Sequence, residues 1–186
     1  MIRQSLILMI LSLFALALPA SVEASMEADQ SAQLRPFYGV SKAKADEILR
    51  ENVQETVIRS VLQKQNSPLA DEADQFVVVA RALDLDPYLL PAITGVESTF
   101  AQFMIPGTYN PFGYGKGTIK FDSWGDGIAK VGYALRYRYI DRGARSLSDI
   151  GHMYASGSDT WAPKVARLMG SFDKEEAKIM RYYELL

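Results

Sequence analysis

The sequence predicts a mainly α-helical fold with one small β-hairpin. After residue 40, apolar residues recur at three- and four-residue spacing through most of the chain, as in amphipathic helices. Serine or aspartate followed by proline marks the start of two of these segments. Between residues 101 and 123 the pattern changes to glycine, proline and aromatic residues, which favours a loop that leads into a hairpin.

The helices follow from their periodicity and their capping residues. Ser123 with Asp126 and Ser146 with Asp149 have the spacing of a capping box, in which each side chain binds a backbone amide of the first turn. The expected helices run from Ser41 to about Gln65, from Pro68 to about Leu83, from Pro87 to about Ser98, from Ser123 through Tyr139, from Ser146 through Tyr154, from Ser158 or Asp159 through Leu168, and from Asp173 to the C-terminus.

The hairpin is expected between Phe112 and Phe121, where residues with high strand propensity flank a glycine-rich turn. Gly115 and Gly117 can adopt the positive φ that a tight turn needs. The glycine spacing superficially resembles a nucleotide-binding loop. No GxxxxGK[ST] pattern is present, however, and no helix follows at the required distance.

The composition excludes several functional classes. The chain has 186 residues, 20 basic and 22 acidic side chains, one histidine and no cysteine. Thiol catalysis, disulfides, cysteine-ligated metals and sites with two histidines are therefore excluded, whereas calcium or magnesium sites built from oxygen ligands alone are not. We expect no metal and no cofactor. A net charge of −2 gives no basis for nucleic-acid binding, which relies on surplus Lys and Arg.

The N-terminus has the features of a secretory signal peptide. Arg3 precedes an apolar run of about 14 residues, and small residues precede a cleavage site after Ala24, with Ala20 as a weaker alternative. An uncleaved anchor is the other interpretation, although the run is shorter than the roughly 20 residues that span a bilayer. We expect a secreted or periplasmic bacterial protein with a signal peptide at residues 1–24, a flexible tether at residues 25–40, and no membrane association after cleavage.

Glu97 is the strongest candidate for chemistry. Counting back by helical steps reaches Ile93 and Leu90, so this carboxylate shares a stripe with apolar core residues. Desolvation and the negative end of the helix dipole should both raise its pKa, as a general acid requires. The alternatives are an exposed Glu at a fraying helix end, or a buried one satisfied by a hydrogen bond.

About half of the chain resembles a known family. The matching segments are Leu89–Ile93 leading into Val96–Phe100, Asn110–Gly115, Phe121–Trp124 with Ile128, and Ile150–Ala155 with Trp161. Their order and spacing resemble the lysozyme-like superfamily, in particular bacterial (mannosyl-glycoprotein endo-) β-N-acetylglucosaminidase-like domains, with soluble lytic transglycosylases as near relatives. The resemblance implies an enzyme that cleaves peptidoglycan glycan strands in a cleft between a helical body and a hairpin lobe. It implies a lysozyme-like domain at residues 41–186, with an N-terminal helix (41–66), a catalytic core (67–170) and a C-terminal helix (171–186).

The resemblance also implies roles for individual residues. Glu97 matches the family's catalytic acid, and Tyr154 matches a tyrosine that faces this acid across the cleft. Ser98 matches a serine that positions the acid or a sugar, although a hydroxyl there often binds backbone instead. Asn110, Phe112 and Gly113 belong to the family's Asn-x-Phe-Gly turn, which shapes the cleft beside the acid and contacts substrate or serves structure alone.

The two tryptophans are further candidates for sugar binding. Trp124 and Trp161 offer surfaces on which sugars stack, but large aromatic residues at helical spacing more often belong to the core, which we favour for Trp161.

The sequence does not determine the type of reaction or its second catalytic group. Glycosidases usually use a second carboxylate, and only Asp122 and Asp126 are candidates, with Asp126 already assigned to a helix cap. Otherwise the substrate's N-acetyl group must assist, either in hydrolysis or in lytic transglycosylation to a 1,6-anhydro product. A non-catalytic wall-binding protein is a further alternative, and we expect a monomer. His152 with Ser156 or Ser158 and Asp159 does not indicate a serine hydrolase, because no G-x-S-x-G elbow is present.

Overall fold

The computed structural model describes residues 41–183. The expected signal peptide (1–24) and tether (25–40) lie outside the described residues. The chain divides into two compact units, Met1–Asp46 and Glu47–Leu186. The first unit is described only at residues 41–46, which include the start of a helix. The second unit contains the whole described core.

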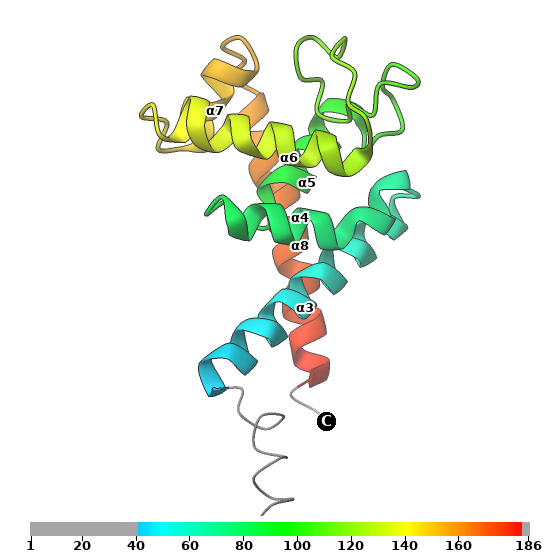
Figure 1. Cartoon of the computed structure of the whole chain (residues 1–186), viewed down its shortest axis with the longest axis vertical. Helices are drawn as coiled ribbons and strands as arrows, with labels where there is room; N and C mark the ends of the chain where they lie inside the picture. Colours follow the sequence, from blue (N-terminus) through cyan, green and yellow to red (C-terminus); the bar gives the residue numbers. More distant parts are fainter. Residues whose placement is uncertain (1–40, 184–186) are drawn as a thin grey trace, which may run out of the picture. The chain divides into compact units, whose positions relative to one another are not determined.

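The described part of the chain is mainly α-helical, as predicted (Figure 1). No helix within residues 41–183 has the length and apolar character needed to cross a membrane. In chain order the elements are α3 (Lys42–Lys64), the 3-10 helix η1 (Pro68–Glu72), α4 (Ala73–Ala82), α5 (Leu89–Ser98), α6 (Trp124–Ala134), the π-helix η2 (Leu135–Ile140), α7 (Leu147–Tyr154) and α8 (Trp161–Tyr183).

The predicted serine caps act as expected, whereas α5 begins at Leu89, after the predicted start at Pro87, and has no side-chain cap. Ser67 accepts a hydrogen bond from the backbone N–H of Leu69 at the start of η1. Ser123 accepts from Asp126, and the Asp126 carboxylate in turn accepts from the backbone N–H of Asp122. Ser146 and Asp149 repeat this arrangement at the start of α7. Local hydrogen bonding therefore sets three of the helix starts.

The predicted β-hairpin is wrong, since no strand occurs among residues 41–183. The segment between α5 and α6 is a series of tight turns, in which the N–H of Gly117 bonds back to the carbonyl of Gly113 at 2.8 Å. The side chain of Asn110 binds the backbone N–H and carbonyl of Tyr114 and the carbonyl of Ile119. This one amide satisfies backbone groups that a strand ladder would otherwise pair.

The expected break before Asp173 is also absent, because α8 continues without interruption from Trp161 to Tyr183. Its apolar residues Trp161, Val165, Leu168 and Phe172 keep a helical spacing across this position. Asp173 is exposed on the helix surface rather than placed at a helix start. The predicted segments around residues 161–168 and 173–186 therefore form one helix as far as Tyr183.

The core is built mainly from α5, which packs against α8, and from α4, which packs against α6 (Figure 1). Leu90 and Ile93 of α5 and Phe172 of α8 are fully buried. Phe76 of α4 and Ile128 of α6 are fully buried as well. Because α5 is enclosed by its neighbours, its C-terminal end is a rigid platform for the side chains it carries.

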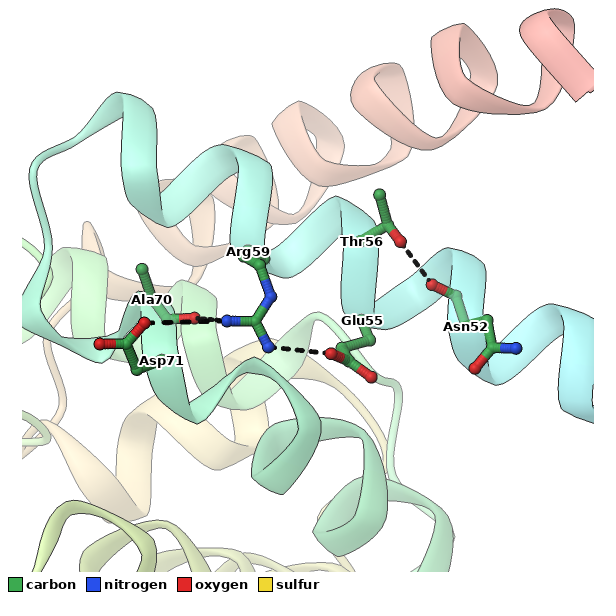
Figure 2. Close-up of polar contacts among 6 residues, drawn as sticks. All are labelled: Asn52, Glu55, Thr56, Arg59, Ala70 and Asp71. Atoms are coloured by element: carbon green, nitrogen blue, oxygen red, sulfur yellow. Dashed lines mark hydrogen bonds and ion pairs between the residues drawn. The ribbon is translucent and has the colours of Figure 1, made fainter.

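Arg59 links α3 to the residues that follow it (Figure 2). Its guanidinium donates to the carbonyl of Ala70 at 2.9 Å and to the Glu55 carboxylate at 2.8 Å. The Asp71 carboxylate lies 3.9 Å from the same group. The part of α3 after residue 47 thus belongs to the body of the second unit, as its buried Val57 and Leu62 also indicate.

Candidate active site

Glu97 lies one residue before the end of α5 and is half-buried. Its Oε1 accepts a hydrogen bond of 2.7 Å from the indole Nε1 of Trp161 at the start of α8. On the other side, Gly113 approaches so closely that a Cβ at this position would lie 2.9 Å from Oε2 of Glu97. The Glu97 carboxyl group therefore lies between the indole N–H of Trp161 and the backbone of Gly113.

The surroundings of Glu97 raise its pKa above the ordinary value, as the sequence predicted. Burial is the main cause, because it penalises the charged carboxylate. The hydrogen bond from Trp161 acts in the opposite direction, since it stabilises the charged form. The net effect favours the protonated carboxylic acid, which is the form that can donate a proton.

Two cavities meet at Glu97. The first has a volume of about 550 Å³ and the second of about 330 Å³. Both are lined by Glu97, Gly113 and Lys116, so the two cavities adjoin at these three residues. Within residues 41–183, no other acidic side chain lines either cavity. A ligand that fills both cavities would therefore pass directly over this one carboxyl group.

The first cavity has an aromatic wall made of Tyr114, Tyr139, Tyr154 and Trp161. The ring centroids of Tyr154 and Trp161 are 5.5 Å apart, and those of Tyr114 and Tyr139 are each 6.2 Å from Tyr154. Aromatic faces with polar edges are surfaces on which sugar rings commonly pack. The second cavity is more aliphatic and includes the exposed side chains of Phe103 and Ile105.

The Tyr154 hydroxyl is fixed by a hydrogen bond of 2.6 Å that it donates to the carbonyl of Phe112. Burial and the nearby charge of Glu97 raise the pKa of Tyr154 well above its usual range, so the phenol stays neutral. Its proton is engaged with backbone, which leaves the oxygen lone pairs for other contacts. The family resemblance implies that Tyr154 faces Glu97 across a cleft, and the two residues line the same cavity.

Ser98 is buried, and its hydroxyl forms hydrogen bonds with three backbone groups. Its hydroxyl lies 2.6 Å from the carbonyl of Pro111 and 3.0 Å from that of Thr94, and it accepts from the N–H of Ala101 at 2.9 Å. Of its two proposed roles, the one that fits these contacts is backbone binding. Ser98 connects α5 to the turn that carries Gly113.

A left-handed turn follows Ser98 immediately. Thr99, Phe100 and Ala101 have φ values of 51°, 57° and 67°, which are unfavourable for residues with a Cβ. The hydroxyl of Ser67 donates to the carbonyl of Phe100 at 2.8 Å and helps to hold the turn. Helix α5 thereby ends directly after the candidate acid, and residues 103–105 beyond this turn line the second cavity.

The predicted Asn-x-Phe-Gly turn lies next to Glu97, but its members differ in role. Asn110 and Phe112 are buried, with the Asn110 amide fully used by backbone groups and the Phe112 ring inside the core. Gly113, with a φ of 61°, is the member that touches the carboxyl group. Asn110 and Phe112 thus shape the turn, Asn110 also lines the second cavity, and Gly113 lines both cavities.

Other predicted site residues lie elsewhere. Trp124 packs edge-on against Tyr109, with 5.0 Å between the ring centroids, and lines neither cavity at Glu97. Asp122 and Asp126 are likewise absent from both linings, and the Asp126 carboxylate is bound to Lys130 at 2.7 Å. His152 contacts the carbonyl of Ser148 through Nδ1, an arrangement typical of a structural histidine on a helix.

Several residues of the site did not stand out in the sequence. Trp161 is buried, as we predicted, yet it also donates the hydrogen bond to Glu97. Tyr114, Lys116 and Tyr139 line the first cavity although no motif marks them as site residues. Tyr139 belongs to the π-helix η2, whose altered turn cannot be read from the apolar spacing.

Comparison with protein-family models and with curated proteins finds no match to this chain.

Proposed function

We propose that this protein is a glycosidase that cleaves the glycan strands of peptidoglycan, with Glu97 as the general acid. The observation that carries the proposal is the position of Glu97, a carboxyl group with a raised pKa at the junction of two cavities. A glycan bound through both cavities would place one glycosidic oxygen beside this acid. The resemblance to β-N-acetylglucosaminidase-like domains of the lysozyme-like superfamily supplies the substrate class.

In the proposed reaction, protonated Glu97 donates its proton to the glycosidic oxygen while the bond from that oxygen to the anomeric carbon breaks. The leaving sugar departs as an alcohol, and positive charge develops on the remaining sugar. The neutral Tyr154 oxygen lies on the same cavity wall and can stabilise this charge through its lone pairs. The partly exposed aromatic faces of Tyr114 and Tyr139 would hold the sugar ring in place.

The nucleophile is proposed to come from the substrate. Glu97 is the only acidic side chain that lines the two cavities within the described residues, so no protein carboxylate is at hand for the second role. The acetamido oxygen of an N-acetylated sugar can attack the anomeric carbon and form an oxazolinium ion. Water then adds to that carbon while its bond to the acetamido oxygen breaks, which restores the N-acetyl group, and the water gives one proton to the Glu97 carboxylate, which regenerates the acid.

A lytic transglycosylase is the second candidate, and the same observation supports it. In that reaction the sugar's own 6-hydroxyl attacks the anomeric carbon, gives its proton to Glu97, and forms a 1,6-anhydro product. This route also needs a single protein carboxylate. Export to the bacterial periplasm or exterior, where peptidoglycan is found, is part of the proposal and rests on the signal-like N-terminus.

The test is digestion of purified peptidoglycan by the purified protein and by its Glu97→Gln variant, with released fragments analysed by mass. Fragments with reducing ends that disappear with the variant would support a hydrolase, and fragments lighter by one water would identify a lytic transglycosylase. Intact binding in a pelleting assay without any release would overturn the enzymatic proposal in favour of a wall-binding protein.

A further inference from the structure

Lys116 occupies a special position at the candidate site, because it lines both cavities that meet at Glu97. Within the part of the chain that the structure describes, no other basic side chain lines either of them. Its neighbours on the cavity walls are aromatic, aliphatic or glycine residues, apart from Glu97 and a few neutral polar groups. Lys116 therefore contributes a positive charge to a surface that is otherwise largely uncharged.

The backbone at Lys116 is fixed by the turns around it. Lys116 has a φ of 60°, and Gly113, Gly115 and Gly117 beside it also have positive φ values. The N–H of Gly117 bonds to the carbonyl of Gly113 at 2.8 Å and to that of Tyr114 at 3.2 Å. The origin of the lysine side chain is thus anchored at the cavity rim, while its four-carbon stem remains free to reach a ligand.

Lys116 is not ion-paired within the described residues, in contrast to Lys64 and Lys130. Lys64 and Lys130 each lie 2.7 Å from a carboxylate, of Glu175 and Asp126 respectively. Among residues 41–183, by contrast, Lys116 forms no ion pair, even though Glu97 lines the same two cavities. The charge of Lys116 is consequently available to an anionic group brought in by a ligand.

We propose that Lys116 binds a carboxylate carried by the glycan substrate, so that the site prefers anionic glycan strands over neutral polymers of N-acetylated sugars. This inference rests on the proposed function and deepens it. Peptidoglycan offers two sources of a carboxylate: the lactyl group of N-acetylmuramic acid when it lacks a peptide, and the stem peptide when it is present. A polymer of N-acetylglucosamine offers neither.

The experiment compares the wild-type protein with Lys116→Met on three ligands: glycan strands stripped of peptide, strands that carry stem peptides, and neutral N-acetylglucosamine oligomers. Binding by calorimetry and cleavage by mass are both measured. We expect Lys116→Met to weaken binding of one or both anionic ligands by about tenfold and to weaken binding of the neutral oligomer by much less. The anionic ligand that loses affinity identifies the source of the carboxylate.

Two variants control for charge and fold. Lys120→Met removes the same charge four positions further along the loop, from an exposed side chain that lines neither cavity, and should leave all three ligands unaffected. Lys116→Arg should restore binding of anionic strands. Lys116→Gly removes the amine at a position whose positive φ suits glycine, and should behave as Lys116→Met does without any loss of folding.

The two proposals can fail separately. If the wild-type protein cleaves peptidoglycan but Lys116→Met affects anionic and neutral ligands equally, the role of Lys116 is refuted and the enzymatic proposal stands. If nothing is cleaved but anionic strands bind in a way that requires Lys116, the enzymatic proposal falls and the carboxylate site stands. Equal affinity of the wild type for all three ligands would also overturn the inference.

Discussion

The indole Nε1 of Trp161 donates to Oε1 of Glu97 over 2.7 Å, although the two residues are 64 positions apart in the chain. This bond connects the last turn of α5 to the first turn of α8 at the point where the two cavities meet. It fixes one oxygen of the carboxyl group and leaves the other facing Gly113. The orientation of the candidate acid and the packing of the two helices are therefore set together.

Glu97 should lower the free energy of unfolding at neutral pH, because burial penalises its charged form. Its folded-state pKa is raised above the ordinary 4.5, so above that pH the unfolded chain ionises more readily than the folded one. The folded state loses stability as pH rises through this range, and it regains none above the folded pKa. Replacing Glu97 by Gln removes the charge while its amide oxygen still accepts the hydrogen bond from Trp161.

We therefore expect Glu97→Gln to melt at a higher temperature than the wild type near pH 7 and at the same temperature below about pH 4. Thermal unfolding across this pH range checks the prediction. Activity should fall by about a hundredfold or more in the same variant, because the proton donor is lost. A variant that melts lower than the wild type at neutral pH would contradict the assigned cause.

Trp161→Phe should change the pH dependence of the reaction. The ring still fills its place in the core, but the N–H that lowers the pKa of Glu97 is gone, so this pKa rises further. Since the acid must be protonated to act, activity is lost as pH rises through its pKa, and this alkaline limb should move to higher pH. Rate profiles for the variant and for Trp124→Phe, the other tryptophan, provide the comparison. An unmoved limb would show that the bond does not tune Glu97.

Gly113→Ala should impair the site more than the fold. A Cβ at this position would lie 2.9 Å from the Glu97 carboxyl group, at a backbone φ of 61°. Gly107→Ala is a matched control, because Gly107 has a φ of 74° but nothing within 4 Å of its added Cβ. Both variants should lose about 1 kcal/mol of stability from the left-handed backbone, and only Gly113→Ala should lose most of its activity. Similar activities in the two variants would refute this role of Gly113.

Asn110→Ala should destabilise the turns that carry Gly113. The substitution removes three hydrogen bonds to the part-buried backbone of Tyr114 and Ile119, which hold the loop together. The free energy of unfolding, measured with urea, should drop by about 2 kcal/mol or more. The exposed Asn52 on α3 serves as control, and its replacement by Ala should change stability by less than about 0.5 kcal/mol. Equal effects at both positions would contradict the role given to Asn110.

Local patterns predicted the helices and the candidate acid. Apolar spacing placed Glu97 on the buried stripe of α5, and serine caps marked the starts of η1, α6 and α7. These features depend on residues within four positions of one another, which a sequence displays directly. The predicted helix start at Asp173 is wrong for the same reason. The residues around Asp173 resemble a helix cap locally, although the apolar stripe of α8 continues past them.

The rest of the site depends on contacts between distant residues. Nothing near Trp161 in the sequence indicates that its N–H reaches Glu97, and nothing near Tyr139 indicates a π-helix. The expected hairpin relied on strand propensity, which is a weak guide where a buried side chain can pair the backbone instead. Asn110 does so here, and its spacing to Tyr114 and Ile119 belongs to no general motif.

The turns around Gly113 depend on a single amide, and the residue after it protects that amide chemically. An asparagine side chain deamidates when the backbone nitrogen of the following residue attacks it and forms a succinimide, which then opens to aspartate or isoaspartate. Residue 111 is proline, whose backbone nitrogen carries no hydrogen, so this reaction is blocked at Asn110. The succinimide route to deamidation is therefore closed to the side chain that binds the backbone of this loop.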